Sequence, residues 1–129
     1  MKNIAAKMVK IMQNCAYVQK NGVNSFHGYK FATASDVLEK VNASLVKHNV
    51  CSVVNAELID MVDTTNQSGN KTEHLATVKT TVNLIDVDSG ETLTLVAIGS
   101  GADVGDKATA KALTSSLKYA YMMSLAIAT

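Results

Sequence analysis

The chain has 129 residues, 47% of them hydrophobic and 18% charged, and its formal net charge is +1. That length suits a single domain over residues 1–129 and excludes a modular enzyme, while the composition excludes a disordered or fibrous protein. A net charge near zero also excludes a uniformly basic nucleic-acid binder, so a polyanion would have to meet a local cluster of cations.

The charges are distributed unevenly along the chain. Residues 1–47 hold seven lysines and two acids, residues 48–106 hold two lysines and nine acids, and residues 107–129 hold three lysines and no acid. All twelve cations are lysines, which attract phosphates as point charges but lack the forked geometry with which arginine recognises guanine. Any nucleic-acid binding is therefore expected to be independent of base sequence.

The sequence contains neither a targeting segment nor a cysteine motif. The apolar stretches are short, and the N-terminus lacks the apolar block and cleavage site of a signal peptide. We therefore expect a cytoplasmic protein with no membrane partner. Cys15 and Cys51 do not form a CxxC motif, and we expect both thiols to be buried.

The first predicted element is an amphipathic helix over residues 2–18. Its apolar side chains recur at helical spacing: Ile4, Met8, Ile11, Met12, Cys15 and Val18. The segment 21–24 contains two asparagines and a glycine and predicts a turn. The aromatic run 26–31 that follows predicts a short strand.

A second helix is predicted to begin at Thr33 or Ser35 and to end near residues 48–49. Thr33 with Asp36, or Ser35 by itself, is a typical N-cap. The apolar face that follows consists of Val37, Leu38, Val41, Leu45 and Val46.

The middle of the chain predicts three strands over residues 52–62, 75–87 and 92–98. In the second strand, apolar and small residues alternate with polar ones, which predicts one buried and one wetter face. Asp88-Ser89-Gly90 predicts a tight hairpin between the last two strands, and the polar segment 63–72 predicts a looser loop between the first two. The strands should therefore form an antiparallel meander.

The C-terminal part predicts a flexible connector over residues 99–105 and then a helix. Asp106 is the expected N-cap, and the helix should continue to about Met123. The predicted order is α-β-α-β-β-β-α. This order describes an α+β fold in which helices pack on one face of an antiparallel meander of three to four strands.

The last predicted helix carries three lysines in one stripe. Lys107, Lys111 and Lys118 fall within about 40° of one another around the helix axis, with Thr114 and Ser115 beside them. No acid in the helix is spaced to pair with these lysines. The small residues around them would let a ligand backbone approach closely: Ala108, Ala110, Ala112 and Ser116. The alternative is that three surface lysines only solvate the helix.

The aromatic run 26–31 has two possible roles. In an extended chain His27, Tyr29 and Phe31 lie on one side and Phe26 and Lys30 on the other. The rings could belong to the core. Alternatively, they could stack unpaired nucleobases, because every base offers a π-face to an aromatic ring.

Catalytic and cofactor motifs are not found. The glycines at 99, 101 and 105 match neither the GxGxxG spacing nor a P-loop, and the three histidines are scattered, so no cofactor and no enzymatic activity are expected. Asp103 and Asp106 could hold a magnesium ion. Capping of the last helix is the commoner role for carboxylates at such a position, and no resident metal is expected.

The sequence resembles a known family in two places. Residues 99–121 (GSGADVGDKATAKALTSSLKYAY) resemble the signature of the Erf family of phage single-strand annealing recombinases, a glycine-rich GDKA segment followed by KAxTxxxKY. Residues 29–32 (YKFA) and 36–38 (DVL) resemble the YKY and DVL motifs of that family. The likeness spans residues 2–129.

The resemblance implies an ATP-independent protein that coats single-stranded DNA, anneals complementary strands in recombination and assembles into homo-oligomeric rings or filaments on a β-β-β-α core. The DNA contacts that it implies are made by Lys107, Lys111 and Lys118, with Tyr29 and Lys30 as further candidates. We add Thr114 as a candidate because it lies beside the lysines on the predicted helix. Family members usually continue into a tail that meets the host's single-strand binding protein. Because the chain ends just after the predicted helix, it is expected to be a trimmed core.

Two other functions compete with single-strand annealing. A double-stranded RNA-binding module shares the order α-β-β-β-α, although it is usually shorter. A small metal-dependent nuclease could use Asp103 and Asp106. We predict an annealing protein, because lysines that hold only the backbone leave the base edges free to pair.

Overall fold

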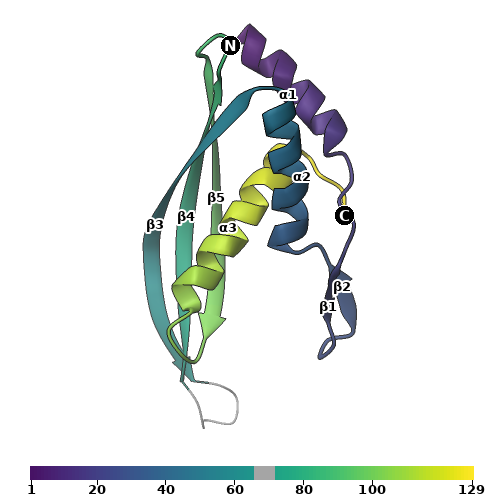
Figure 1. Ribbon diagram of the computed structural model, residues 1–129. Helices are drawn as coiled ribbons and strands as arrows, with labels where there is room; N and C mark the ends of the chain where they lie inside the picture. The colour runs from purple at the N-terminus through teal and green to yellow at the C-terminus, as the bar shows by residue number, and fades with distance from the viewer. Residues whose placement is uncertain (66–71) are drawn as a thin grey trace.

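The computed structural model describes residues 1–65 and 72–129, which fold into two small layers of helix and sheet (Figure 1). The elements are, in chain order, α1 (Lys2–Asn14), β1 (Gly22–Asn24), β2 (Tyr29–Phe31), α2 (Ala34–Lys47), β3 (Val50–Thr65), β4 (Thr72–Asp86), β5 (Thr92–Asp103) and α3 (Ala108–Ser124). The predicted α+β class is confirmed, with one strand more than predicted before α2.

Strands β3, β4 and β5 form an antiparallel meander in that spatial order. The hairpin predicted between β4 and β5 is present: the Gly90 N–H donates to the Asp86 carbonyl at 2.7 Å, and Gly90 adopts a φ of +76° that suits glycine. The loop predicted over residues 63–72 is shorter than expected at both ends. Residues 63–65 belong to β3 and residue 72 belongs to β4. Residues 66–71 lie outside the described part of the chain.

The predicted alternation in β4 is confirmed and determines where the core lies. Side chains at alternate positions from 76 to 86 are buried, and α3 packs on this face over β4 and β5. The core also takes in α1, α2 and the C-terminal residues, as in Ile4, Ile11, Val37, Val41, Tyr121 and Leu125. Helices therefore cover one face of β4 and β5, as Figure 1 shows, whereas the residues of β3 after Val50 are exposed.

The connector predicted over residues 99–105 is wrong for its first part, because β5 continues to Asp103. Gly99 and Gly101 lie directly beneath α3. A Cβ atom on Gly99 would lie 2.7 Å from the Cα of Ser116, and one on Gly101 would lie 2.5 Å from the backbone nitrogen of Ala112. These two glycines therefore allow a close approach of helix to strand and do not supply flexibility.

The N-terminal region differs from the prediction in its boundaries. Helix α1 ends at Asn14, four residues earlier than predicted, and Met12 of its predicted apolar face is 37% exposed. The turn predicted over 21–24 is strand β1, which pairs with β2 in a two-stranded hairpin. The turn lies later, because the Asn24 carbonyl and side chain accept the N–H groups of Gly28 and His27 at 2.8 and 3.0 Å.

Helix α2 begins as predicted. The Thr33 hydroxyl accepts the Asp36 N–H at 3.0 Å while the Asp36 carboxylate accepts the Thr33 N–H at 2.8 Å, which is a complete capping box. Val37, Val41 and Leu45 of its predicted apolar face are buried, but Val46 is 70% exposed.

Two further predictions concern the burial of the two cysteines and the absence of a membrane partner. Cys15 is buried as predicted, whereas Cys51 is exposed, because it lies on the edge strand β3, whose residues after Val50 are exposed on both faces. Within residues 1–65 and 72–129, no helix has the length and apolar character that are needed to cross a bilayer.

Candidate nucleic-acid interface

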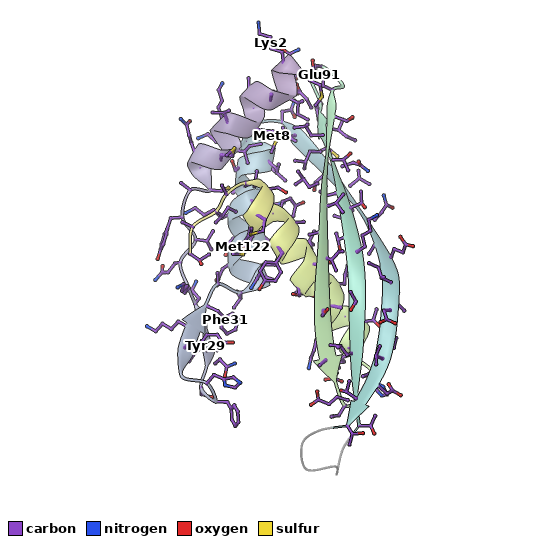
Figure 2. All side chains as sticks on the ribbon, turned by 180° about the vertical axis from the view of Figure 1, so that it is seen from behind. Lys2, Met8, Tyr29, Phe31, Glu91 and Met122 are labelled. Atoms are coloured by element: carbon purple, nitrogen blue, oxygen red, sulfur yellow. The ribbon has the colours of Figure 1, made fainter. Side chains whose placement is uncertain are left out.

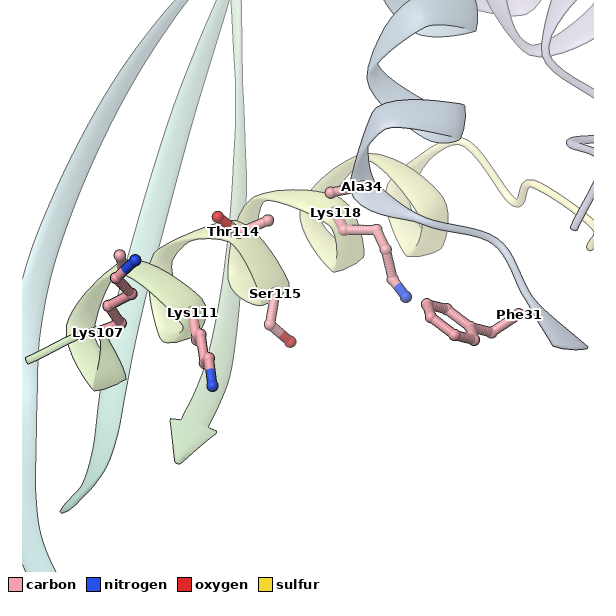
Figure 3. A pocket seen from close by; sticks show the side chains of 8 residues that line it. Phe31, Ala34, Lys107, Lys111, Thr114, Ser115 and Lys118 are labelled. Carbon is pink, nitrogen blue, oxygen red and sulfur yellow. The ribbon is translucent and has the colours of Figure 1, made fainter. Parts of the chain in front are cut away.

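A groove of about 380 Å³ lies between α3 and the segment that joins β2 to α2 (Figure 3). It is lined by Phe31, Ala34, Lys107, Ala110, Lys111, Thr114, Ser115 and Lys118. Four of the six residues predicted to contact DNA therefore line one concave surface. The other two, Tyr29 and Lys30, lie on the neighbouring hairpin.

Helical periodicity places the four predicted α3 residues on this groove. Positions 107, 111, 114 and 118 are three or four residues apart, so they share one side of the helix. Most of the small residues predicted to open the lysine stripe to a ligand face the other way: Ala108, Ala112 and Ser116 are buried. Only Ala110 lines the groove, because the close helix–sheet contact needs the remaining small side chains.

The start of α3 is held by Asp103 and not by Asp106. The helix begins at Ala108, and Lys107 at the N-cap position makes no side-chain cap bond. Asp103 Oδ2 instead accepts the N–H groups of Gly105 and Lys107 at 2.9 and 3.2 Å. The predicted cap at Asp106 is therefore wrong: the N-cap position is Lys107, and β5 extends further than expected and brings Asp103 to the segment before the helix.

The three lysines have different electrostatic surroundings. Lys111 Nζ lies 2.7 Å from Asp103 Oδ1, and within the described residues it is the only one of the three in an ion pair. Lys118 Nζ donates to the Ala32 carbonyl at 3.1 Å and lies 5.8 Å from the centre of the Phe31 ring, towards which it points in Figure 3. As predicted, no acid of the helix pairs with the stripe, but Lys111 has an acidic partner from the sheet, which the helical spacing could not indicate.

The Asp103 carboxylate is strongly stabilised in its charged form. The hydrogen bond from Lys111, followed by those from the backbone of Lys107 and Gly105, lowers the pKa of Asp103 to about 2. Asp103 is therefore a fixed negative charge beside Lys111 at neutral pH. Since it is already engaged by these donors, it makes a poor magnesium ligand, and residues 1–65 and 72–129 contain no cluster of three or more metal-ligating side chains.

The aromatic residues of the β1–β2 hairpin are exposed. Phe26 is 89% exposed and Tyr29 51%, so the core role considered for them is wrong. Rings follow one another along the hairpin, with centroid distances of 6.2 Å from His27 to Tyr29 and 6.1 Å from Tyr29 to Phe31. Figure 2 shows Tyr29 and Phe31 on this hairpin, well separated from the sheet layer. The predicted common side holds for Tyr29 and Phe31, which lie in β2, whereas residues 26–28 of the predicted strand belong to the turn, and the Phe26 ring lies 4.8 Å from that of His27.

Phe31 connects the hairpin to the lysines, and although the sequence offered it as a ring that could stack a base, its position beside Lys118 was not predicted. The Phe31 ring packs against Gly22: a Cβ atom on Gly22 would lie 2.7 Å from Cζ of Phe31. The same ring closes one end of the groove beside Lys118. Lys30 is exposed but points to the other side of the strand from Phe31. No local pattern could have joined Phe31 to Lys118, because the two are 87 positions apart.

The comparison with protein families agrees with these observations. Residues 4–129 match the family model described as the ERF superfamily. The chain belongs to the ERF superfamily. No match was found among curated proteins or among solved structures.

Membership of the ERF superfamily confirms the resemblance found in residues 29–38 and 99–121. The ERF family is known for annealing proteins of phage recombination and not for catalytic enzymes, so membership supports a single-strand annealing role in general. It favours that role over the double-stranded RNA-binding and nuclease alternatives.

Proposed function

We propose that this ERF protein binds single-stranded DNA along the groove between α3 and the β1–β2 hairpin and anneals complementary strands without ATP. One observation carries the proposal. Lys107, Lys111 and Lys118 line a single groove whose far end is closed by Phe31, and this half-buried ring is followed on the hairpin by the exposed ring of Tyr29.

The size of the lysine row fits a short stretch of a single strand. At about 1.5 Å per residue the row from Lys107 to Lys118 spans about 16 Å along the helix axis. At about 3.4 Å per stacked nucleotide this length corresponds to about five nucleotides. Lysine holds phosphates as a point charge, so such contacts fix the strand without reading its bases.

The two sides of the groove would act on different parts of the strand. Cations on α3 face a ligand from one side, and aromatic rings continue along the hairpin from Phe31 to Tyr29. Stacking on an aromatic ring leaves the hydrogen-bonding edge of a base free. A strand held in this way is aligned and can still test a second strand for complementarity, which is what annealing requires.

The glycine-rich segment supports independence from ATP. A phosphate-binding loop needs backbone N–H groups that are open to the nucleotide. Gly99 and Gly101 instead lie in β5 beneath α3, where even a Cβ atom would clash with the helix. The segment therefore has a packing role that leaves no space for a triphosphate.

The proposal includes assembly of several copies along one strand, because each copy covers only about five nucleotides by the estimate above. Strand β3 is at the edge of the sheet, and six of its large apolar residues are exposed: Val53, Val54, Leu58, Ile59, Met61 and Val62. An edge strand with apolar side chains on both faces is a favourable site for pairing with another chain.

Charge supports a contact between unlike surfaces in this assembly. Asp86, Asp88, Glu91 and Asp103 pair with cations of the same chain. The expected attraction between the acidic middle and the basic ends of a neighbour therefore depends on acids such as Glu57 and Asp60 of β3. Two copies of β3 side by side would bring these acids together, which favours a head-to-tail arrangement and hence a ring or filament. Recruitment of a host single-strand binding protein stays a prediction.

The function is tested by mixing two complementary oligonucleotides with the protein in the absence of ATP and monitoring their annealing by fluorescence. Lys107→Gln with Lys118→Gln should weaken single-strand binding for every sequence and reduce the log–log salt slope by about 1.4, since each lost phosphate contact accounts for about 0.7. Lys10→Gln with Lys47→Gln removes two exposed cations outside the groove and serves as the matched control.

The proposal predicts that the unaltered protein anneals the two strands and that only the groove variant loses affinity for single-stranded DNA. An unchanged salt slope in the groove variant, or an equal loss in the control, would show that the row only solvates the helix. Cleavage of labelled DNA in magnesium would support the nuclease instead, and preferred binding of duplex RNA would support the RNA-binding module.

Assembly is tested by sedimentation with and without single-stranded DNA. Leu58→Glu places a charge at an exposed position of β3 and should reduce the particle to a monomer, whereas Val9→Glu on the exposed side of α1 should not. A monomer in all samples of the unaltered protein would refute the assembly.

A further inference from the structure

Asp103, the last residue of β5, is a carboxylate beside the row of lysines that is proposed to bind DNA. Its two oxygens have separate partners. Oδ1 lies 2.7 Å from the Lys111 ammonium, whereas Oδ2 accepts the backbone N–H groups of Gly105 and Lys107 at 2.9 and 3.2 Å. The Asp103 side chain is 19% exposed, and that of Lys111 is 53% exposed.

We propose that Asp103 occupies, at Lys111, the place of a DNA phosphate, so that single-stranded DNA and Asp103 compete for this ammonium. The inference rests on the proposed function, because it concerns the same groove. It assigns to Asp103 a positioning role that sets how tightly one copy of the chain holds a strand.

Lys111 keeps a charge-assisted hydrogen bond when a DNA phosphate replaces Asp103. Carboxylate and phosphate oxygens both accept charge-assisted hydrogen bonds from an ammonium group, so Lys111 can replace one with the other. Lys111 also donates to the Ala102 carbonyl at 3.3 Å, a longer bond to a neutral oxygen. Its flexible stem and its exposure allow the ammonium to turn from the sheet towards the groove.

The exchange leaves the helix start intact. Asp103 Oδ2 keeps the N–H groups of Gly105 and Lys107 whether or not Oδ1 is paired, so the carboxylate remains held after Lys111 moves. Lys107 and Lys118 are in no ion pair within the described residues, and they are free to take a phosphate first. Binding at Lys111 is thereby weakened relative to its neighbours, which favours release of a strand once it has paired.

The low pKa of Asp103 agrees with this arrangement. Lys111 is the largest cause of the lowering, and the two backbone N–H groups follow. The carboxylate is therefore charged at every pH at which annealing would be measured, and its competition with phosphate does not depend on pH near neutrality.

Asp103→Asn tests the competition. Asparagine keeps a side-chain oxygen for the two N–H groups at the helix start and removes the charge. We expect this variant to bind a labelled oligothymidine about two to five times more tightly, the range of an exposed ion pair, and to steepen the log–log salt slope by about 0.7. In a Lys111→Gln background the same substitution should change neither quantity.

Asp106→Asn is the matched control, because it removes an exposed carboxylate three residues away. The inference is overturned if Asp103→Asn changes neither affinity nor slope, if Asp106→Asn has an equal effect, or if the effect persists without Lys111. Failure of the unaltered protein to bind oligothymidine would instead refute the proposed function.

A measurement on the unaltered chain decides the matter if Asp103→Asn does not fold. Carboxyl NMR should show the pKa of Asp103 rising from about 2 when oligothymidine is added, because Lys111 has moved to a phosphate. An unchanged pKa in the complex would show that Lys111 stays with Asp103 and would overturn the inference.

Discussion

Gly99→Ala and Gly101→Ala should each destabilise the protein strongly. A Cβ atom on Gly99 would lie 2.7 Å from the Cα and 2.8 Å from the Cβ of Ser116, and one on Gly101 would lie 2.5 Å from the Ala112 nitrogen. Most of these atoms belong to the helix backbone, which cannot rotate away as a flexible side chain would. The helix must therefore move off the sheet.

The expected cost is at the upper end of the range for overpacking, about 3 kcal/mol for each substitution. For a domain of this size such a cost lowers the melting temperature by roughly 10 °C. Urea denaturation followed by circular dichroism measures it directly. Gly101→Ala should also weaken DNA binding, because its Cβ would lie 2.6 Å from the Cβ of Lys111 and displace that lysine.

Gly105→Ala is the matched control for the two glycines. A Cβ atom there would meet only Asp103 Oδ2, at 3.2 Å, so the expected change in the free energy of unfolding is within about 0.5 kcal/mol. If Gly99→Ala and Gly101→Ala unfold at the same urea concentration as Gly105→Ala, the close packing of α3 on β5 is refuted.

Three further predictions concern the hairpin, the pH dependence and the core. Tyr29→Ala should weaken single-strand binding by about 1–3 kcal/mol without lowering the melting temperature, and equal affinity would remove the stacking role. The backbone N–H of Thr33, then the Asn21 side chain, lowers the pKa of Asp36 to about 2, so the unfolded chain binds a proton more readily and stability falls as pH drops from about 4 to about 2. Asp36→Asn should flatten that dependence in acid denaturation, and an unaltered curve would contradict it. Leu84→Ala at a fully buried position of β4 should cost about 3 kcal/mol by urea denaturation, and a change below 1 kcal/mol would place Leu84 outside the core.

Elements defined by short-range patterns were predicted well. The capping box of Thr33 and Asp36 and the alternating burial of β4 both follow from neighbours within four residues. The row of Lys107, Lys111 and Lys118 on one side of α3 follows in the same way from the helical period.

Predictions failed where a distant partner decides the outcome. Glycines near position 100 are typical of a loop, but α3 packs on Gly99 and Gly101 and makes them part of a strand. The aromatic residues of the hairpin are typical of a core, yet Phe26 and Tyr29 are exposed because the hairpin lies beside the domain and not within it.

The amino-acid sequence by itself determined the helices, the meander and the lysine row, because each depends on the period at which side chains recur along a local backbone. Only the tertiary structure decided that Phe31 closes the groove beside Lys118 and that Asp103 neutralises Lys111. Both contacts join elements through the packing of α3, and their energies depend on distances that no local repeat encodes. The charge that the groove offers to a DNA strand is therefore a property of the folded chain.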